Sequence, residues 1–168
     1  LAILVSDFVL SLVLDVLSLY RDPAVARILA RTTRIMSEGE AEEASIRSRG
    51  ERINLDGYLS VLEKKTASLF SAAAELGAVI AGTAREVEDA LAEYGRLVGL
   101  AYQLRDDLLD WGKPGEISSL LDPGAARELE AISADLADRA VELTGVLPES
   151  PVRELLAELA RFATRWVG

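Results

Sequence analysis

The stretch Tyr94–Trp111, YGRLVGLAYQLRDDLLDW, predicts a long helix around which the rest of the chain is organised. Its large apolar side chains recur every three or four residues, which is the period of one helical face. They are Leu97, Leu100, Leu104, Leu108 and Trp111. At about 100° per residue, four polar side chains also share one stripe, roughly 100° wide. These are Gln103, Asp106, Asp107 and Asp110.

Three carboxylates on adjoining helical turns repel one another, so the stripe is expected to meet something positive. That partner could be a lysine, solvent or a metal ion. Carboxylate oxygens suit Mg²⁺, a hard cation that keeps several waters and bridges to substrate phosphates. A solvated acidic patch on an exposed helix explains the same spacing, and the spacing alone leaves both interpretations open.

Composition narrows the possible fold and chemistry. The chain has 168 residues, half of them hydrophobic and only 5% aromatic, and it is rich in Ala and Leu, which favours one all-helical domain. A net charge of −10 argues against a nucleic-acid partner. Because the sequence lacks both cysteine and histidine, disulfides, thiol catalysis, Ser-His-Asp triads and imidazole-based metal sites are excluded.

Residues 1–20, LAILVSDFVLSLVLDVLSLY, are almost continuously apolar. We expect no membrane span, because an Asp such as Asp7 or Asp15 near the centre of a span costs about 2.5–3.5 kcal/mol. The basic segment of a signal peptide is also absent. We therefore expect a fully buried helix of a cytoplasmic protein, in a single partial domain (residues 1–168) whose N-terminal part is missing.

Further helices are predicted over residues 23–46, 56–80, 84–111, 122–143 and 152–166, with a polar connection at 47–55. The short turn between 56–80 and 84–111 predicts an antiparallel pair. Lys65 lies on the apolar face of the first of these helices and therefore needs an anion nearby. That anion could be a ligand in a cavity shared with the acidic stripe; snorkelling or a structural ion pair would also satisfy Lys65.

Two segments resemble the trans-isoprenyl diphosphate synthases, or polyprenyl synthetases. Gly99–Asp110, GLAYQLRDDLLD, resembles their second aspartate-rich motif, and Tyr58–Phe70, YLSVLEKKTASLF, resembles their Y-x₆-KTA-x-L-F segment. Gly39-Glu40 is similar to a GE or GQ step of the family, in which Gln or Asp often stands where this chain has Glu43. The resemblance extends over roughly residues 2–120.

The resemblance implies an antiparallel helical bundle, all-α, that forms part of the isoprenoid synthase fold without its N-terminal helices. It implies an Mg²⁺-dependent prenyltransferase that condenses an allylic diphosphate with isopentenyl diphosphate. By the resemblance, Asp106, Asp107 and Asp110 hold the metal. It also implies that the substrate diphosphate is bound by Lys65, Thr66, Gln103 and Lys113, with Lys65, Thr66, Gln103, Asp106 and Asp107 as catalytic residues.

The sequence departs from the family pattern in two places. No first DDxxD motif with paired arginines precedes the KT segment, and the loop after Asp110 looks shortened, without a lysine beyond Lys113. We therefore expect a fragment with little activity alone, which forms a homodimer, or a heterodimer with a chain that carries the first motif. The alternatives are a non-catalytic partner subunit of a heteromeric synthase, or a helical binding or scaffolding domain.

Overall fold

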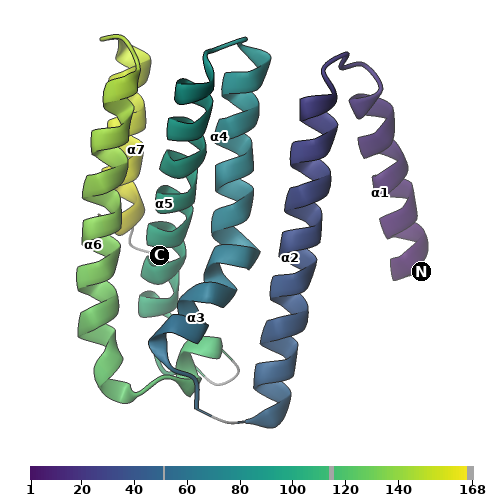
Figure 1. Ribbon diagram of the computed structural model, residues 1–168. Coiled ribbons are helices and arrows are strands. Elements are labelled where there is room, and N and C mark those ends of the chain that lie inside the picture. Colours follow the sequence, from purple (N-terminus) through teal and green to yellow (C-terminus); the bar gives the residue numbers. More distant parts are fainter. Residues whose placement is uncertain (51, 114–115, 166–168) are drawn as a thin grey trace.

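The computed structural model describes residues 1–50, 52–113 and 116–165. Within them every regular element is helical, and the long helices run side by side and antiparallel (Figure 1). The expected all-α antiparallel bundle is thus confirmed. The elements are α1 Ala2–Leu17, α2 Pro23–Arg49, α3 Leu55–Leu62, a π-helical turn Glu63–Ala67, α4 Ser68–Ile80, α5 Arg85–Leu109, 3₁₀ turns Ile117–Leu120, Pro123–Ala125 and Thr144–Val146, α6 Ala126–Leu143, and α7 Pro151–Arg165.

Helix boundaries follow from local chemistry. The Asp22 carboxylate accepts a hydrogen bond from the Ala24 amide at 2.8 Å, and Pro23 occupies the first turn, as expected for an N-terminus. Gly50 ends α2 in the left-handed region, at φ 64°. The helix predicted from residue 122 begins instead with a 3₁₀ turn, and the one predicted over 152–166 is α7, while residue 166 lies outside the described residues.

Helix α5 is central to the core. Its Leu97, Leu100 and Leu104 are buried, as their spacing predicted, and α4 and α6 pack along it. Gly95 and Gly99 allow α4 to come close, since a Cβ on either would lie 2.8 Å from an atom of Phe70. The predicted antiparallel pairing of these two helices is therefore held by backbone-to-backbone contact rather than by side chains alone.

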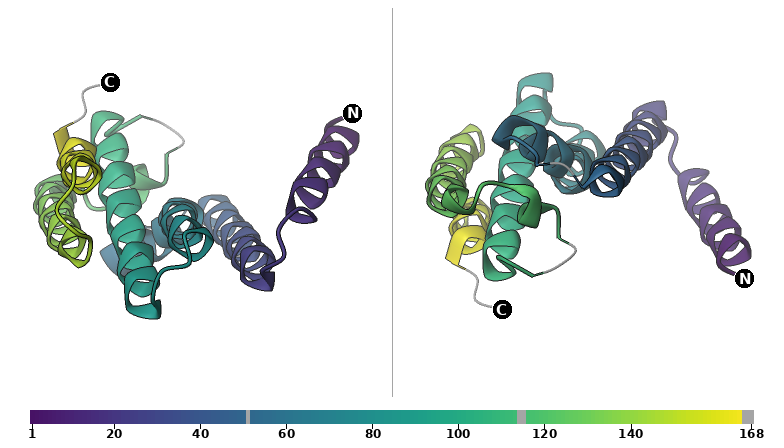
Figure 2. Two further views of the ribbon diagram at one scale, coloured as in Figure 1. Left: turned by 90° about the horizontal axis from the view of Figure 1, so that it is seen from above. Right: turned by 90° about the horizontal axis from the view of Figure 1, so that it is seen from below.

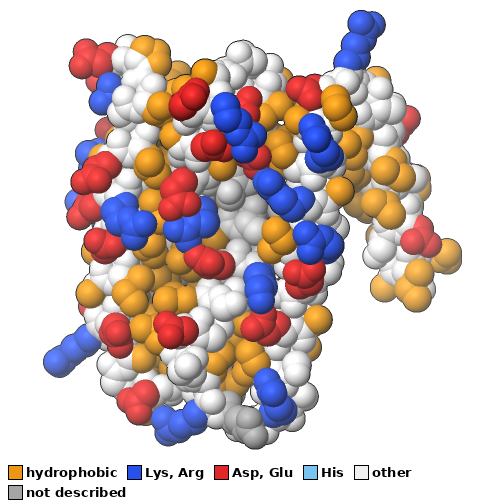
Figure 3. All heavy atoms as spheres, viewed as in Figure 1, with side chains coloured by type: hydrophobic (Ala, Val, Ile, Leu, Met, Phe, Trp, Pro, Cys, Tyr) orange, Lys and Arg blue, Asp and Glu red, His pale blue; other side chains and the backbone are white. Residues whose placement is uncertain are grey.

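The predicted burial of residues 1–20 is wrong for the part of the chain that the structure describes. Helix α1 contains no buried residue and stands apart from the other helices (Figure 2). In the space-filling view it forms a largely hydrophobic arm (Figure 3). A helix that is apolar on all sides normally lies inside a larger structure. Among the described residues, however, nothing covers its outer faces.

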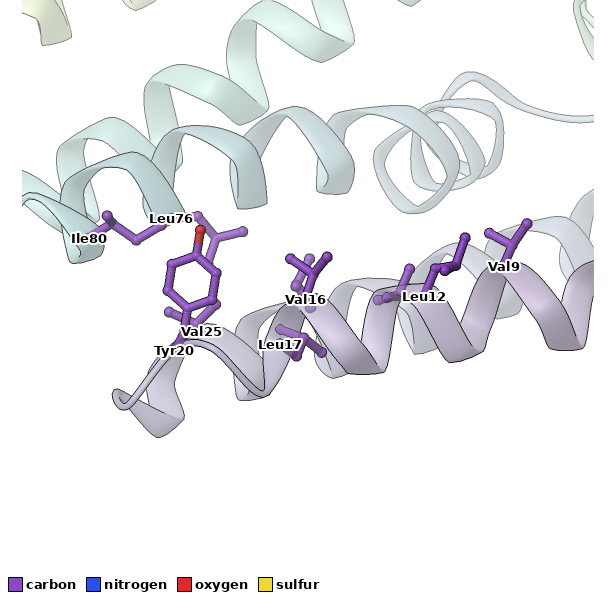
Figure 4. A pocket seen from close by; sticks show the side chains of 10 residues that line it. Val9, Leu12, Val16, Leu17, Tyr20, Val25, Leu76 and Ile80 are labelled. Carbon is purple, nitrogen blue, oxygen red and sulfur yellow. The ribbon is translucent and has the colours of Figure 1, made fainter.

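An apolar groove of about 450 Å³ runs between α1, α2 and α4 (Figure 4). Tyr20, Val25, Leu76 and Ile80 line one part of it, and Val9, Leu12, Val13, Val16, Leu17 and Leu29 complete the lining. Within the described ranges, no helix is long and apolar enough to cross a membrane. The expected cytoplasmic location stays a prediction.

Candidate functional site

Two parts of the chain supply the candidate site: the segment from α3 through the π-helical turn, and the C-terminal half of α5. A chain of three hydrogen bonds joins them. The Thr66 hydroxyl donates to Gln103 Oε1 at 2.9 Å, and Gln103 Nε2 donates to Asp107 Oδ1 at 2.8 Å. The Tyr58 hydroxyl donates to the other carboxylate oxygen, Asp107 Oδ2, at 2.5 Å. We call these four residues the polar chain.

Asp107 is the buried acceptor within the polar chain, held from both sides. Its residue is 6% exposed, and each of its carboxylate oxygens accepts one hydrogen bond. Burial raises the pKa of Asp107, although the bonds from Tyr58 and Gln103 oppose that effect. Burial also raises the pKa of Tyr58, and the Asp107 charge adds to this, so the phenol stays protonated as a donor. Asp107 therefore orients Gln103, and Gln103 orients Thr66.

Asp106 and Asp110 lie on the same stripe of α5 but are more exposed than Asp107. Asp110 caps the C-terminal end of the helix, where the partial negative charge favours a cation, and Lys113 Nζ forms an ion pair with it. That ion pair raises the pKa of Lys113. Lys113 is therefore paired with the acidic motif, and its implied contact with the substrate diphosphate stays a prediction.

The three aspartates do not converge into one cluster. Among the described residues, no group of three acidic, histidine or cysteine side chains is arranged to hold a metal ion. Magnesium nevertheless usually takes only one or two carboxylates, with waters and substrate phosphates as its other ligands. Asp106 and Asp110 fit that requirement as hard oxygen donors. Asp107 fits it less well, because both of its oxygens already accept hydrogen bonds.

Lys65 leaves the π-helical turn in another direction from Thr66. Its ammonium forms an ion pair with Glu43 on α2, and a second with Glu40 Oε1 at 3.3 Å. Burial alone would lower the pKa of Lys65, but the bonds and charges of Glu43 and Glu40 outweigh it and raise the pKa. Lysine's expected need for an anion is thus met by a structural ion pair, one of the alternatives that the sequence left open.

Local backbone geometry explains why neighbouring residues reach different helices. The turn Glu63–Ala67 is π-helical, a wide turn with i→i+5 bonding that occurs often at functional sites. From it, Lys64 and Lys65 reach α2, whereas Thr66 reaches α5. The helix predicted over 56–80 is therefore three segments in series, α3, the π-helical turn and α4.

Sequence reasoning missed the roles of two residues. In the sequence Tyr58 only begins the segment that resembles the family's KT segment, yet its hydroxyl fixes Asp107. A usable signal existed, since a buried carboxylate needs donors and Tyr58 begins the segment that contains Lys65 and Thr66. Glu43 stands out in the sequence only as a departure from a family pattern, and the spacing along α2 does not reveal its contact with Lys65.

Comparisons with known proteins concern the family and the fold of the chain. Over 117 residues the chain is 44% identical to the (2E,6E)-farnesyl diphosphate synthase of Mycobacterium tuberculosis, a match that covers 67% of this chain and 32% of the relative. The chain thus matches only about a third of that relative's length. The polyprenyl synthase of Caulobacter crescentus, solved with calcium and isoprenyl diphosphate, superimposes with a TM-score of 0.84 at 30% identity. That alignment covers 96% of this chain and 64% of the Caulobacter chain.

A second solved structure extends the fold comparison. The geranylgeranyl pyrophosphate synthetase of the archaeon Geoglobus acetivorans gives a TM-score of 0.85 at 27% identity, over 98% of this chain and 66% of that one. The family model described as Polyprenyl synthetase matches residues 1–117, close to the range in which the resemblance was seen. The chain therefore belongs to the polyprenyl synthetase family, and its helices form part of the isoprenoid synthase fold.

Proposed function

We propose that the chain provides the metal- and diphosphate-binding part of a prenyl diphosphate synthase, which condenses an allylic diphosphate with isopentenyl diphosphate. One observation carries the proposal: the polar chain joins Thr66 of the KT pair to Asp107 of the DDxxD motif. Thr66 and Gln103 are 37 positions apart in the sequence, and the bond between them supports one shared site for the two sequence signals. The Caulobacter relative was solved as a complex with isoprenyl diphosphate, which supports the same substrate class.

In the proposed reaction the allylic C–O bond breaks, the alkene of isopentenyl diphosphate forms a new C–C bond, and a proton leaves the neighbouring carbon. Bound Mg²⁺ would supply Lewis-acid stabilisation of the departing diphosphate. Asp106 and Asp110 would hold the metal. Thr66 and Lys65 would contact diphosphate oxygens, and these contacts strengthen where water is excluded. Asp107 would act by positioning Gln103.

We propose that the site is completed by helices beyond those that the described residues provide. Apolar side chains are uncovered at both ends of the bundle, on α1 and on α7. On α7 the exposed residues recur at spacings of three, four and three: Val152, Leu155, Leu159 and Phe162. We propose that further helices cover these faces and bring the first aspartate-rich motif. They would belong to the same polypeptide or to a partner, in a homodimer or heterodimer.

A second candidate function is that of a non-catalytic partner subunit. It is favoured by the absence of a three-ligand metal group among the described residues and by the Lys113 ion pair on Asp110. In that role the chain would pack against a catalytic subunit without holding the metal itself. Metal-dependent ligand binding separates the two candidates.

The test is thermal unfolding with MgCl₂ and inorganic pyrophosphate. At a ligand concentration 100 times Kd, binding to the folded state alone adds about 2.7 kcal/mol, which corresponds to roughly 5–10 °C in Tm for a chain of this size. We expect Asp106→Asn and Asp110→Asn to reduce the shift, and the control Asp138→Asn, at an exposed position of α6, to keep it. An equal shift in all variants would contradict the proposed metal site.

Activity is then measured after the chain is combined with the part of the Mycobacterium tuberculosis relative that precedes the matched segment. Condensation that collapses in Asp106→Ala and in Lys65→Ala is expected. Full retention of activity in both variants would overturn the site assignment. No condensation in any combination, together with a stable complex, would favour the non-catalytic subunit.

A further inference from the structure

The ammonium of Lys65 already contacts an internal anion. Glu43 is the closer of its two carboxylate partners and the less exposed one, with 12% of its side chain accessible against 67% for Glu40. Lys65 itself keeps 24% of its side chain accessible. The Glu43 carboxylate also accepts from Arg47 at 3.3 Å, one turn later on α2. Glu43 is therefore held at the lysine from its own helix.

Close helix packing maintains this contact. Gly39 lies one turn before Glu43 on α2, and a Cβ there would lie 2.7 Å from Lys64 Cβ and 3.0 Å from Lys65 Cγ. The missing side chain allows α2 to lie directly against the π-helical turn. Lys64 uses the same approach to pair with Glu42 at 2.5 Å. The two lysines thus face two consecutive carboxylates across one packed interface.

We propose that Glu43 competes with the substrate diphosphate for Lys65 and so lowers the affinity of the site for it. A carboxylate and a diphosphate offer the ammonium the same kind of anionic oxygen acceptor. While Glu43 holds Lys65, the positive charge available to an incoming diphosphate is partly neutralised, and the carboxylate repels the ligand. The inference rests on the proposed function, because it assumes that Lys65 binds diphosphate.

The competing explanation assigns Glu43 a supporting role, in which it points Lys65 at the diphosphate. The two explanations predict opposite changes in diphosphate affinity when Glu43 is replaced by glutamine. If Glu43 competes, its neutral isostere tightens diphosphate binding, whereas if it supports, the isostere weakens binding. Glu42→Gln is the matched control, because it removes the same charge one residue away, from a carboxylate that pairs with Lys64.

The experiment is isothermal titration of the full chain with inorganic pyrophosphate at fixed MgCl₂ concentration. We expect Glu43→Gln to tighten binding roughly three- to tenfold, because it removes one negative charge next to the anionic ligand at a partly exposed site. Glu42→Gln should stay within about twofold of the parent chain, because screening weakens a more distant charge. Circular dichroism of each variant confirms that the helices are intact.

A double-mutant cycle links the effect to the lysine. In a Lys65→Met background, Glu43→Gln should tighten binding less than it does in the parent chain, because the competition for the ammonium is gone and only the repulsion between the carboxylate and the ligand remains. Unchanged or weaker binding by Glu43→Gln, combined with weakened binding by Lys65→Met, overturns the inference and leaves the proposed function standing. If Lys65→Met does not weaken binding, the proposed role of Lys65 fails, and the inference fails with it.

Discussion

The buried bond between Tyr58 and Asp107 makes Tyr58→Phe the most informative single substitution. It removes one hydroxyl from a fully buried ring and leaves one oxygen of a buried carboxylate without its donor. A hydrogen bond to a charged group contributes about 1.5–3 kcal/mol, so we expect the free energy of unfolding to fall by that amount at neutral pH. Urea unfolding followed by circular dichroism measures it.

Tyr94→Phe is the matched control within the same core. The Tyr94 hydroxyl donates to the neutral carbonyl of Leu156 at 2.7 Å, so its removal should cost only about 0.5–1.5 kcal/mol. Burial raises the pKa of Tyr94 to about 12, so this phenol does not ionise in the range tested. The control therefore separates the effect of a charged acceptor from the effect of losing any buried tyrosine hydroxyl.

The pH dependence of Tyr58→Phe gives a second, independent readout. Because the pKa of Asp107 is raised in the folded chain, its protonated form favours folding, and this contribution is lost as pH rises from the ordinary value of 3.8 through the folded pKa. The Tyr58 bond lowers that folded pKa, so its removal raises the pKa further. The loss in stability should therefore be largest at pH 8 and narrow as the pH is lowered toward 5. Equal losses in the two tyrosine variants, or a loss that grows on acidification, would refute the reasoning.

Three further predictions concern packing and charge. Gly95→Ala should destabilise the fold by about 1–3 kcal/mol, because the added Cβ meets the Phe70 backbone. Gly77→Ala should stabilise the fold by about 0.5–1 kcal/mol, because a Cβ there meets nothing within 4 Å. Thermal unfolding measures both effects. Arg31→Met should lower the free energy of unfolding by about 1–3 kcal/mol, because it leaves buried Glu75 unpaired. Adding Glu75→Met should recover most of that loss, as measured by urea unfolding. No recovery in the double variant would contradict the ion-pair explanation. Deleting residues 1–19 should change the free energy of unfolding by no more than about 0.5 kcal/mol and reduce the binding of a hydrophobic dye, because no residue of α1 is itself buried; a large loss of stability would show that α1 is packed in solution.

The helices could be predicted because both signals that define a helix, the spacing of its apolar residues and the chemistry of its ends, lie within its own stretch of sequence. Leu97, Leu100 and Leu104 show one apolar face by their spacing, and Asp22-Pro23 marks a helix start by its chemistry. The environment of α1 could not be predicted in this way. An all-apolar helix is suited to burial, but its sequence does not say which surface covers it.

The site was predicted only in part. Spacing placed Gln103 and Asp107 on one stripe, the family resemblance identified Lys65 and Thr66 as a pair, and the polar chain connects Thr66 to that stripe. The direction of Lys65 could not be foreseen, because it depends on the distance between α2 and the π-helical turn. That distance follows from the lack of a side chain at Gly39, which one-dimensional spacing does not convey.

The π-helical turn has a consequence for how this part of the chain can change over evolution. A π turn contains about one residue more than an α turn, so losing one residue from Glu63–Ala67 would convert it to ordinary helix and leave the helix beyond it nearly in register. Phe70 and Ser71 would then stay against the glycines of α5. The directions of the side chains within the turn would change, because the wide turn sends Lys64 and Lys65 to α2 and Thr66 to α5. A one-residue deletion here should therefore remove the contacts of the site and preserve the pairing of α4 with α5.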